Sequence, residues 1–228
     1  MNHVTKIEFT GDLTLDQSNI LKQSLDTADQ MQSKLPHEIL LMEGMSGKKY
    51  RSLINTLVEK THNARYLEVG SWAGSTVCSA MYGNTCKVTC IDNWSEFGGP
   101  KESFMHNTSK YITTDINFTF IEKDFRQVDF SNIGKFNIYL FDGPHNEKDQ
   151  YDGITMALPA LDDTFILIVD DWNWPDPRKG TLDALSSSGL NILTKLEIRT
   201  TNDNSHGPYS GQHGDWHNGY FIAVVSKK

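Results

Sequence analysis

The chain has 228 residues, 38% of them apolar, and a formal net charge of −8. This length and apolar content suit one α/β domain, and the negative charge disfavours a nucleic-acid partner, which would need a concentrated face of Lys and Arg. The first twenty residues contain no apolar run of signal-peptide length and no later stretch reaches the ~20 apolar residues that span a bilayer, so we expect a cytoplasmic protein without a membrane partner.

The first part of the chain, residues 1–62, is predicted to be an N-terminal helical cap. Residues 15–31 have the composition of one helix, which ends before Pro36. Residues 63–228 are predicted to form a Rossmann-like core, so that 1–228 is a single domain. After Ser46, apolar residues recur with the i, i+3, i+4, i+7 spacing of a helix packed on a core, at Tyr50, Leu53, Ile54, Leu57 and Val58.

From Arg65 onward, short β-branched and aromatic runs alternate with helical stretches, which is the pattern of βαβ units. The predicted fold class is therefore α/β, with a Rossmann-like, mostly parallel sheet of seven strands and helices on both faces. The last two strands are joined by a loop, so we expect the final strand to pair antiparallel with its neighbour at one edge. The predicted strands cover residues 66–69, 87–91, 118–121, 136–141, 165–169, 192–199 and 220–225.

A glycine-containing turn follows the first predicted strand, at the sheet edge where doubly wound folds bind ligands. Gly70 permits a tight turn, Gly74 permits close approach, and Ser75 can cap the next helix. Trp72 fills a position that a dinucleotide fingerprint leaves to glycine, which disfavours a diphosphate. S-adenosylmethionine tolerates this residue, and Glu68 could accept its ammonium group directly or through water. A purely structural turn is the alternative. The predicted cofactor residues here are Glu68, Gly70, Ser71, Trp72, Gly74 and Ser75.

Acidic residues also follow the next two predicted strands. Asp92 lies about twenty residues beyond the glycine turn, where a carboxylate can accept both ribose hydroxyls. A helix-capping or solvated aspartate is the alternative. Asn93 and Trp94 come next, and the indole could cover the adenine or pack in the core. After the third strand, Asp124 could accept the adenine amino hydrogens, with Phe125 beside it.

Three aspartates end the fourth and fifth predicted strands: Asp142 the fourth, Asp170 and Asp171 the fifth. Because parallel strands end at one sheet edge, these carboxylates should converge beside the cofactor, and three like charges need a cation. Oxygen ligands favour Mg²⁺ first and Mn²⁺ or Ca²⁺ next. Solvated aspartates that cap helices are the alternative.

The predicted catalytic residues are His145 and Asp170. An imidazole with an ordinary pKa of about 6.5 can take the proton of a hydroxyl bound at a cation. Asp170 or Asp171 is the competing base, and a structural role for His145 stays open. Residues 171–175 and 205–218 are rich in aromatic rings and imidazoles, so they are candidate substrate loops or a surface loop between edge strands.

Four motifs carry a resemblance to a known family. They are Y-L-E-V-G-S-W-x-G-S-T at 66–76, D-N-W at 92–94, D-G-x-H at 142–145 and V-D-D-W at 169–172. With the expected seven strands, residues 45–174 resemble the cation-dependent class I S-adenosylmethionine-dependent O-methyltransferases, of the catechol type and, closer in motif style, the macrolide and sugar type. The bacterial "methyltransferase domain" set is nearest.

The resemblance implies roles for several residues. Met45 would contact the methionine portion of the cofactor or cover it. The spacing from Asp142 to Asp170 and Asp171 is similar to that of the family's metal ligands. His145 occupies the position where catechol-type enzymes have a lysine. Asp171 stands where those enzymes have asparagine, as in sugar-type enzymes, which puts a catechol acceptor in doubt.

Three functions follow as hypotheses. The first is divalent-cation-assisted O-methylation of a small hydroxylated acceptor, sugar-like or phenolic. The second is a protein of the same fold that binds S-adenosylmethionine without cation-dependent chemistry, as an N-methyltransferase or a binding module. The third, a nicotinamide oxidoreductase, is disfavoured by Trp72 and by the lack of a Tyr-x-x-x-Lys pair. The expected partner is a small-molecule acceptor, and a homo-oligomer stays open.

Overall fold

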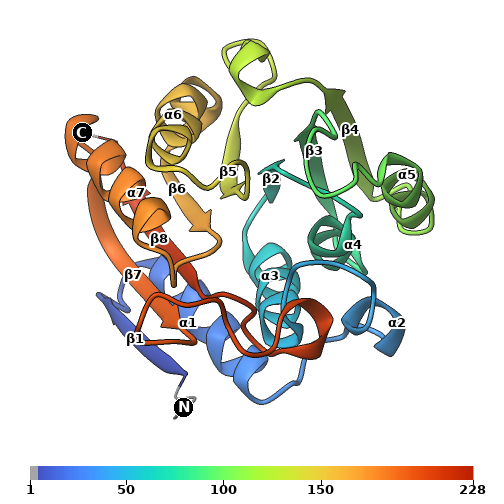
Figure 1. Cartoon of the computed structure of the whole chain (residues 1–228), viewed down its shortest axis with the longest axis horizontal. Coiled ribbons are helices and arrows are strands. Elements are labelled where there is room, and N and C mark those ends of the chain that lie inside the picture. Colours follow the sequence, from blue (N-terminus) through green and yellow to red (C-terminus); the bar gives the residue numbers. More distant parts are fainter. Residues whose placement is uncertain (1–4, 228) are drawn as a thin grey trace.

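A computed structural model describes residues 5–227, which form one eight-stranded sheet with helices on both faces (Figure 1). The strands are β1 (Lys6–Gly11), β2 (Arg65–Val69), β3 (Cys86–Asp92), β4 (Ile116–Glu122), β5 (Phe136–Phe141), β6 (Leu161–Val169), β7 (Asn191–Arg199) and β8 (Tyr220–Ser226). The helices are α1 (Asp16–Asp29), α2 (His37–Leu40), α3 (Lys48–Lys60), α4 (Ser75–Met81), α5 (Lys101–Ser109), α6 (Glu147–Ala157), α7 (Pro175–Ser187) and the short 3₁₀ helices η1 (Phe125–Gln127), η2 (Leu158–Ala160) and η3 (Gly211–His213).

The strand order across the sheet is β1-β7-β8-β6-β5-β2-β3-β4. Strands β6, β5, β2, β3 and β4 are parallel neighbours, whereas β8 pairs antiparallel with both β6 and β7. The predicted α/β class, with a mostly parallel sheet and an antiparallel last strand, is confirmed. This topology brings the carboxyl ends of β2, β3, β5 and β6 to one edge.

The sheet has eight strands rather than the predicted seven because β1 pairs antiparallel with β7. This strand also moves β7 from the edge of the sheet to its interior. Of the six residues of β1, only Phe9 is partly buried, so the alternation of apolar and polar residues is weak. A pattern this weak does not distinguish the strand from the helix that follows it. The first 62 residues are therefore more than a helical cap; residues 1–4, like 228, lie outside the described part of the chain.

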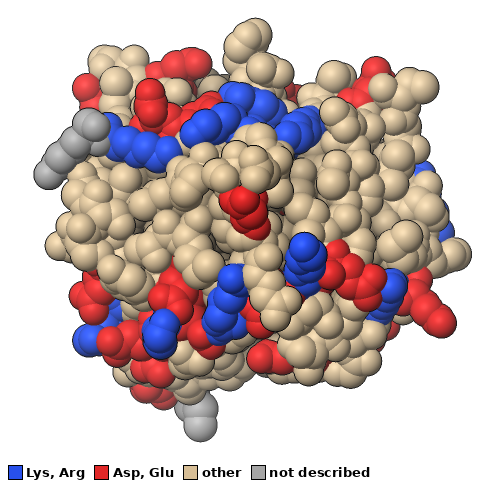
Figure 2. Space-filling view, turned by 90° about the horizontal axis from the view of Figure 1, so that it is seen from above, with Lys and Arg blue, Asp and Glu red and all other residues tan. Residues whose placement is uncertain are grey.

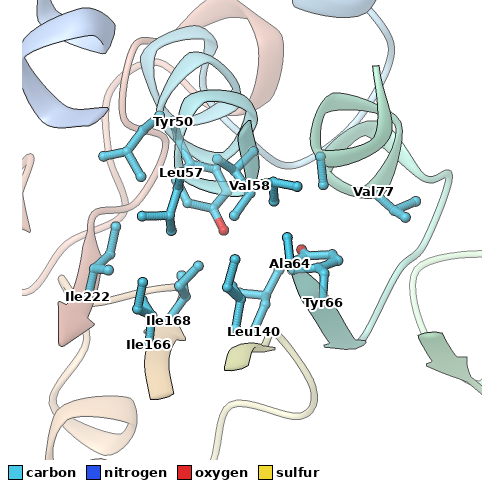
Figure 3. Close-up of a cluster of buried hydrophobic side chains, with 14 of the residues drawn as sticks. Tyr50, Leu57, Val58, Ala64, Tyr66, Val77, Leu140, Ile166, Ile168 and Ile222 are labelled. Atoms are coloured by element: carbon cyan, nitrogen blue, oxygen red, sulfur yellow. The ribbon is translucent and has the colours of Figure 1, made fainter. Parts of the chain in front are cut away.

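Two apolar layers hold the helices on the sheet. In β6, Ile166 and Ile168 face the layer under α1, α3 and α4, while Phe165 and Leu167 face the layer under α6 and α7. This alternation is the period of two expected of a strand buried on both faces. Figure 3 shows α3 over the strands, with Leu57 above the isoleucines of β6. Helix α3 is thus part of the sheet's covering layer.

The long loop between β7 and β8, residues 200–219, is fastened to the start of α3. The backbone N–H groups of Lys48 and Lys49 donate to the carbonyls of Gly214 and Asp215 at 2.9 and 3.0 Å. These amides belong to the first turn of α3, which has no intrahelical partners for them. The loop therefore caps a buried helix and has a defined position. Within residues 5–227, no helix has the length and apolar character needed to cross a bilayer.

Candidate active site

A cavity of about 590 Å³ lies beyond the carboxyl ends of the central strands. Its wall brings together residues from distant parts of the chain, the first at position 45 and the last at position 217. Four predicted residues lie behind this wall: Glu68, Ser71, Gly74 and Ser75. The predicted residues that line the cavity are Met45, Gly70, Trp72, Asp92, Asn93, Trp94, Asp124, Phe125, Asp142, His145, Asp170 and Asp171.

Gly70 lies where the glycine turn after β2 packs against the loop that follows β5 at Asp142. Its φ is +84°, and a Cβ atom built there would lie 1.8 Å from the carbonyl oxygen of Asp142. The backbone N–H of Asp142 also donates to the carbonyl of Val69 at 2.9 Å. Only glycine fits this contact, because any side chain would overlap the main chain of the neighbouring loop. The two halves of the site therefore share one main-chain contact.

Asp92 holds the glycine turn in place. Its Oδ2 accepts the backbone N–H groups of Ser71 and Trp72 at 2.8 and 3.0 Å, and its Oδ1 accepts that of Trp94 at 2.8 Å. The carboxylate lines the cavity but already has three protein donors. Each carboxylate oxygen has two lone pairs, so Oδ1 can accept one more hydrogen bond, and the ribose role stays a prediction.

The two tryptophans of the cofactor end form its outer wall. The indole N–H of Trp72 donates to the carbonyl of Phe97 at 2.9 Å, which ties the glycine turn to the loop at 93–99. Trp94 lines the cavity and also packs against Phe104 and Phe120, with ring centroids 5.3 and 5.5 Å apart. The core packing that was one alternative for Trp94 is therefore present, and its role beside the adenine stays a prediction.

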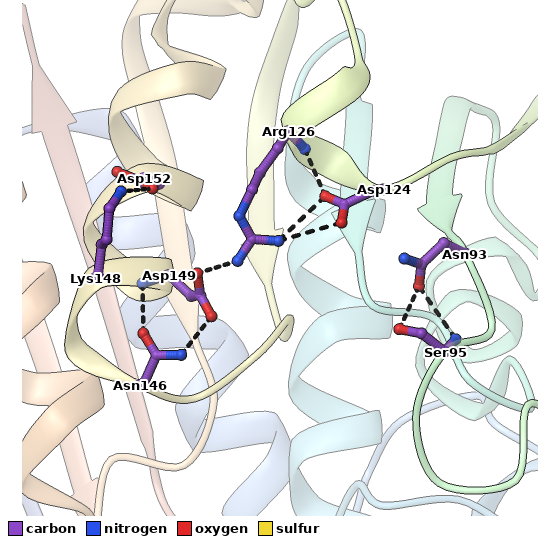
Figure 4. A network of polar contacts seen from close by, with 8 residues as sticks. All are labelled: Asn93, Ser95, Asp124, Arg126, Asn146, Lys148, Asp149 and Asp152. Atoms are coloured by element: carbon purple, nitrogen blue, oxygen red, sulfur yellow. Dashed lines mark hydrogen bonds and ion pairs between the residues drawn. The ribbon is translucent and has the colours of Figure 1, made fainter.

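Asp124 begins a polar network at the edge of the cavity (Figure 4). It accepts the backbone N–H of Arg126 at 2.9 Å and pairs with the guanidinium of the same residue. Arg126 in turn pairs with Asp149 in the first turn of α6, where Asn146 is the cap. Arg126, Asn146 and Asp149 line the cavity too, and the sequence motifs had not pointed to them.

Glu68 and Ser75 lie elsewhere than predicted. Glu68 is fully buried under the turn, and the hydroxyl of Tyr66 donates to its Oε2 at 2.5 Å. Burial raises the pKa of Glu68 to about 8. The residue is therefore a buried acid behind the cavity wall and does not contact the cavity directly. Ser75 does not cap α4: Gly74 is the N-cap residue, and Ser75 Oγ lies 3.0 Å from Ser46 Oγ.

Three aspartates and His145 converge at the other end of the cavity. The imidazole Nε2 of His145 lies 2.7 Å from Asp171 Oδ2 and 3.5 Å from Asp142 Oδ1. The backbone N–H of Asp171 donates to Asp170 Oδ1 at 2.7 Å. Asp171 has a left-handed backbone (φ +56°), which turns its carboxylate toward His145. The convergence inferred from the strand ends is thus present.

The charges of this cluster shift its protonation. Desolvation raises the pKa of Asp142 and of Asp170. Burial would raise the pKa of Asp171 as well, but the hydrogen bond and charge of His145 lower it. Burial lowers the pKa of His145, yet the nearby carboxylates of Asp142 and Asp171 outweigh it and raise the value to about 11. His145 therefore carries a proton in this arrangement and serves as the counter-ion of the carboxylates.

Three aromatic rings and one amide complete the aspartate end of the cavity. All but Trp174 come from the loop at 200–219. Trp174, His206 and His217 line the cavity, with ring centroids 5.9 Å apart between the first two and 5.2 Å between the histidines. Asn218, fully buried, donates from Nδ2 to Asp171 Oδ1 at 2.7 Å. No role was predicted for Asn218, because 47 residues separate it from Asp171 and no local motif connects them.

The donor chemistry of the cluster fits a divalent cation. Asp170 and Asp171 are buried and Asp142 is half-buried, so three carboxylates share a small volume with one imidazolium. Oxygen ligands of this kind suit hard cations such as Mg²⁺. Asp170, Asp171 and His217 also offer ligand atoms within 4.8 Å of one another, a second grouping that an ion could use.

Comparison with known proteins agrees with this fold. Residues 67–172 match a family model described as "Methyltransferase domain". No curated protein sequence matches the chain. Among solved structures, cofactor-bound Rv0187 from MTB is similar with a TM-score of 0.57 at 15% identity, covering 92% of this chain and 91% of that one. An O-methyltransferase from Bacillus cereus in complex with SAH has a TM-score of 0.55 at 13% identity, covering 91% of each chain.

Another similar structure, TrmN from Thermus thermophilus, has a TM-score of 0.52 at 14% identity; 78% of this chain aligns, but it spans only 48% of TrmN. At such identities the likeness establishes the fold alone. The family match lies on the segment that holds the glycine turn and all three aspartates. The chain therefore has the fold of these methyltransferase structures, and the segment that builds the site matches the methyltransferase family model.

Proposed function

We propose that this protein transfers the methyl group of S-adenosylmethionine to a hydroxyl oxygen of a small acceptor, sugar-like or phenolic, with the help of a divalent cation. In this reaction the O–CH₃ bond forms as the S–CH₃ bond breaks. The hydroxyl proton passes to a base, and S-adenosylhomocysteine leaves. The rate would come mainly from holding oxygen, methyl carbon and sulfur in line.

One observation carries the proposal: the cofactor turn and the aspartate cluster line the same cavity and touch through Gly70 and Asp142. A methyl donor on the turn and a hydroxyl at the aspartates would thus be neighbours. Proximity of this kind is what a direct displacement requires.

Asp142, Asp170 and Asp171 would hold the cation. When bound, a divalent cation orients a hydroxyl and lowers its pKa. The residue that then receives the proton is His145 or one of the aspartates. His145 lies between Asp142 and Asp171, and their negative charge keeps its proton in place. Neutralising that charge would lower the pKa of His145 and let it act as a base.

A small acceptor is favoured over a nucleic acid. The net charge is −8, and on the face shown in Figure 2 acidic side chains border the basic ones. Phosphate backbones are bound by concentrated positive charge. Trp174 and His206 add flat rings to the cavity wall, which suit a ring-sized acceptor.

A second candidate is methyl transfer or cofactor binding without a cation. It is favoured by His145 itself, which lies 2.7 Å from Asp171 and already balances part of the negative charge. An imidazolium could then take the place of a metal ion in the cluster.

Calorimetric titration with S-adenosylmethionine, with and without Mg²⁺, separates the two candidates. The proposal expects cofactor binding together with a Mg²⁺ signal that Asp142→Ala removes. Cofactor binding without any cation signal would select the second candidate. A protein that does not bind S-adenosylmethionine would refute both, and the likeness would then concern fold only.

A further inference from the structure

The protonation form of His217 is set by a main-chain contact. The ring is buried, and its Nδ1 lies 2.8 Å from the backbone nitrogen of Gly211, whose N–H donates to it. An amide nitrogen can only donate, so Nδ1 must offer a lone pair. A neutral imidazole has one protonated nitrogen, and here that nitrogen is Nε2.

The His217 ring lines the cavity, and its protonated nitrogen is Nε2. It lies 3.9 Å from Asp171 Oδ1, which is too far for a hydrogen bond. Asp171 Oδ1 instead accepts the N–H of Asn218 at 2.7 Å. His217 lines the cavity, so its N–H is directed to a space where a ligand oxygen could accept it.

The orientation of the Asn218 amide is also determined. Its Oδ1 accepts from Asn173 Nδ2 at 2.9 Å and from the backbone N–H of Gly207 at 3.0 Å. Its Nδ2 must therefore be the group that faces Asp171, since the opposite orientation would lose both acceptor contacts. The Asn218 amide thus occupies Oδ1 of Asp171, while Oδ2 lies 2.7 Å from the imidazole of His145.

These contacts decide between two roles for His217. One ring nitrogen of His217 and carboxylate oxygens of Asp170 and Asp171 lie within 4.8 Å of one another, as metal ligands would. However, a nitrogen that carries a proton has no lone pair to give a cation. Ligation through Nε2 would need the proton on Nδ1, directed against the N–H of Gly211.

We infer that His217 is an acceptor-binding residue that donates its Nε2 proton to an oxygen of the methyl acceptor, and that it is not a metal ligand. The inference rests on the proposed function. Because the donor lies beside the aspartates, the oxygen it binds would neighbour the hydroxyl that is methylated.

The tautomer can be tested without any activity. Long-range ¹H–¹⁵N spectra of the full chain labelled with ¹⁵N-histidine report which ring nitrogen carries the proton, and His217→Phe identifies the signals. We expect a proton on Nε2 of His217 both before and after addition of Mg²⁺ and S-adenosylhomocysteine. A proton on Nδ1, or loss of the Nε2 proton when Mg²⁺ is added, would overturn the inference.

Metal affinity gives a second readout, with Mn²⁺ as the probe. His217→Phe keeps a ring of similar size and should leave the Mn²⁺ affinity unchanged, whereas Asp171→Asn should lower it at least about tenfold. His213→Phe, an exposed histidine of the same loop, is the matched control. Equal losses in His217→Phe and Asp171→Asn would make His217 a ligand.

Catechol, added with Mg²⁺ and S-adenosylhomocysteine, is the probe for the acceptor oxygen. It should shift the Nε2–H signal of His217 in the wild type and bind about two- to tenfold more weakly to His217→Phe. No shift in the wild type, or equal affinity in the two proteins, would refute the acceptor role. Failure of S-adenosylmethionine to bind in calorimetry would instead refute the proposed function, so the two failures are distinguishable.

Discussion

The two ends of the cavity are built in different ways. At the cofactor end, the contacts join neighbouring segments of the chain, as when Asp92 at the end of β3 accepts the amides of Ser71 and Trp72, which follow β2, and of Trp94. At the acceptor end, Asp171 depends on Asn218, which lies 47 residues away on another loop. Hydrogen bonds to backbone amides of one βαβ unit therefore define the first end, whereas contacts between charged and amide side chains of distant loops define the second.

The strongest test of this division is Asp142→Ala. If the ends have separate roles, the rate of Mg²⁺-dependent turnover should fall at least about a hundredfold in the variant, because a ligand of the cation is gone. Its affinity for S-adenosylmethionine should stay as in the wild type, as measured by calorimetry. Equal losses of both properties would show that the ends are one functional unit.

Gly70→Ala should break both ends together. The new Cβ would overlap the carbonyl of Asp142, so we expect a loss of about 5 kcal/mol in the free energy of unfolding. Gly98→Ala is the matched control: its φ is +81°, yet within the described residues nothing lies within 4 Å of the added atom. It should lose about 1 to 2 kcal/mol from backbone strain alone. Urea denaturation of both variants measures the difference.

Glu68→Gln tests whether the buried acid of the cofactor end is structural. Burial raises the pKa of Glu68 to about 8, so the folded protein holds this proton more tightly than the unfolded chain. Its contribution to stability therefore falls as pH rises from about 4.5 to about 8. Removing the charge should stabilise the variant relative to wild type by about 3 kcal/mol more at pH 8 than at pH 5.5.

Chemical denaturation at the two pH values gives that result, with the exposed Glu102→Gln as control. A parallel titration with S-adenosylmethionine should show unchanged affinity. A large loss of affinity in Glu68→Gln would mean that this carboxylate takes part in cofactor binding after all, through water or a movement of the turn.

Asp92→Ala should give the smallest effect of the four. Three backbone amides would lose their acceptor, so the turn would loosen and S-adenosylmethionine should bind about tenfold more weakly. Asp129→Ala is the control, because Asp129 accepts a backbone N–H in a similar exposed turn, from Ser131 at 3.1 Å. Unchanged cofactor affinity in Asp92→Ala would show that the turn keeps its shape without the carboxylate.

The sequence predicted the parts of the fold that depend on neighbouring residues. The convergence of Asp142, Asp170 and Asp171 followed from one rule, that parallel strands end at the same edge of a sheet. Strand β1 was missed because its residues are mostly exposed and its pairing partner, β7, is almost 200 residues away. No periodic pattern of the segment itself reports such a pairing.

The direction of individual side chains was harder to predict. Glu68 is fully buried, does not line the cavity and accepts the hydroxyl of Tyr66, which its position in the motif could not reveal. His145 was assigned a free imidazole, but the neighbouring carboxylates hold its proton. Asn218 and Arg126 act through partners on other elements, which the spacing of residues along the chain cannot reveal.

The loop at 200–219 has a consequence for changing what the protein acts on. Its two ends are fixed by the pairing of β7 with β8, and its middle is fixed by the first turn of α3. Replacing Ser205, His206 and residues 208–210 would therefore alter the acceptor end of the cavity while leaving the sheet and the methyl-donor turn as they are. Gly207 is best kept, because a Cβ there would overlap the carbonyl of His217 and its N–H orients Asn218. A library confined to the other five positions is a compact way to redirect the protein to new acceptors.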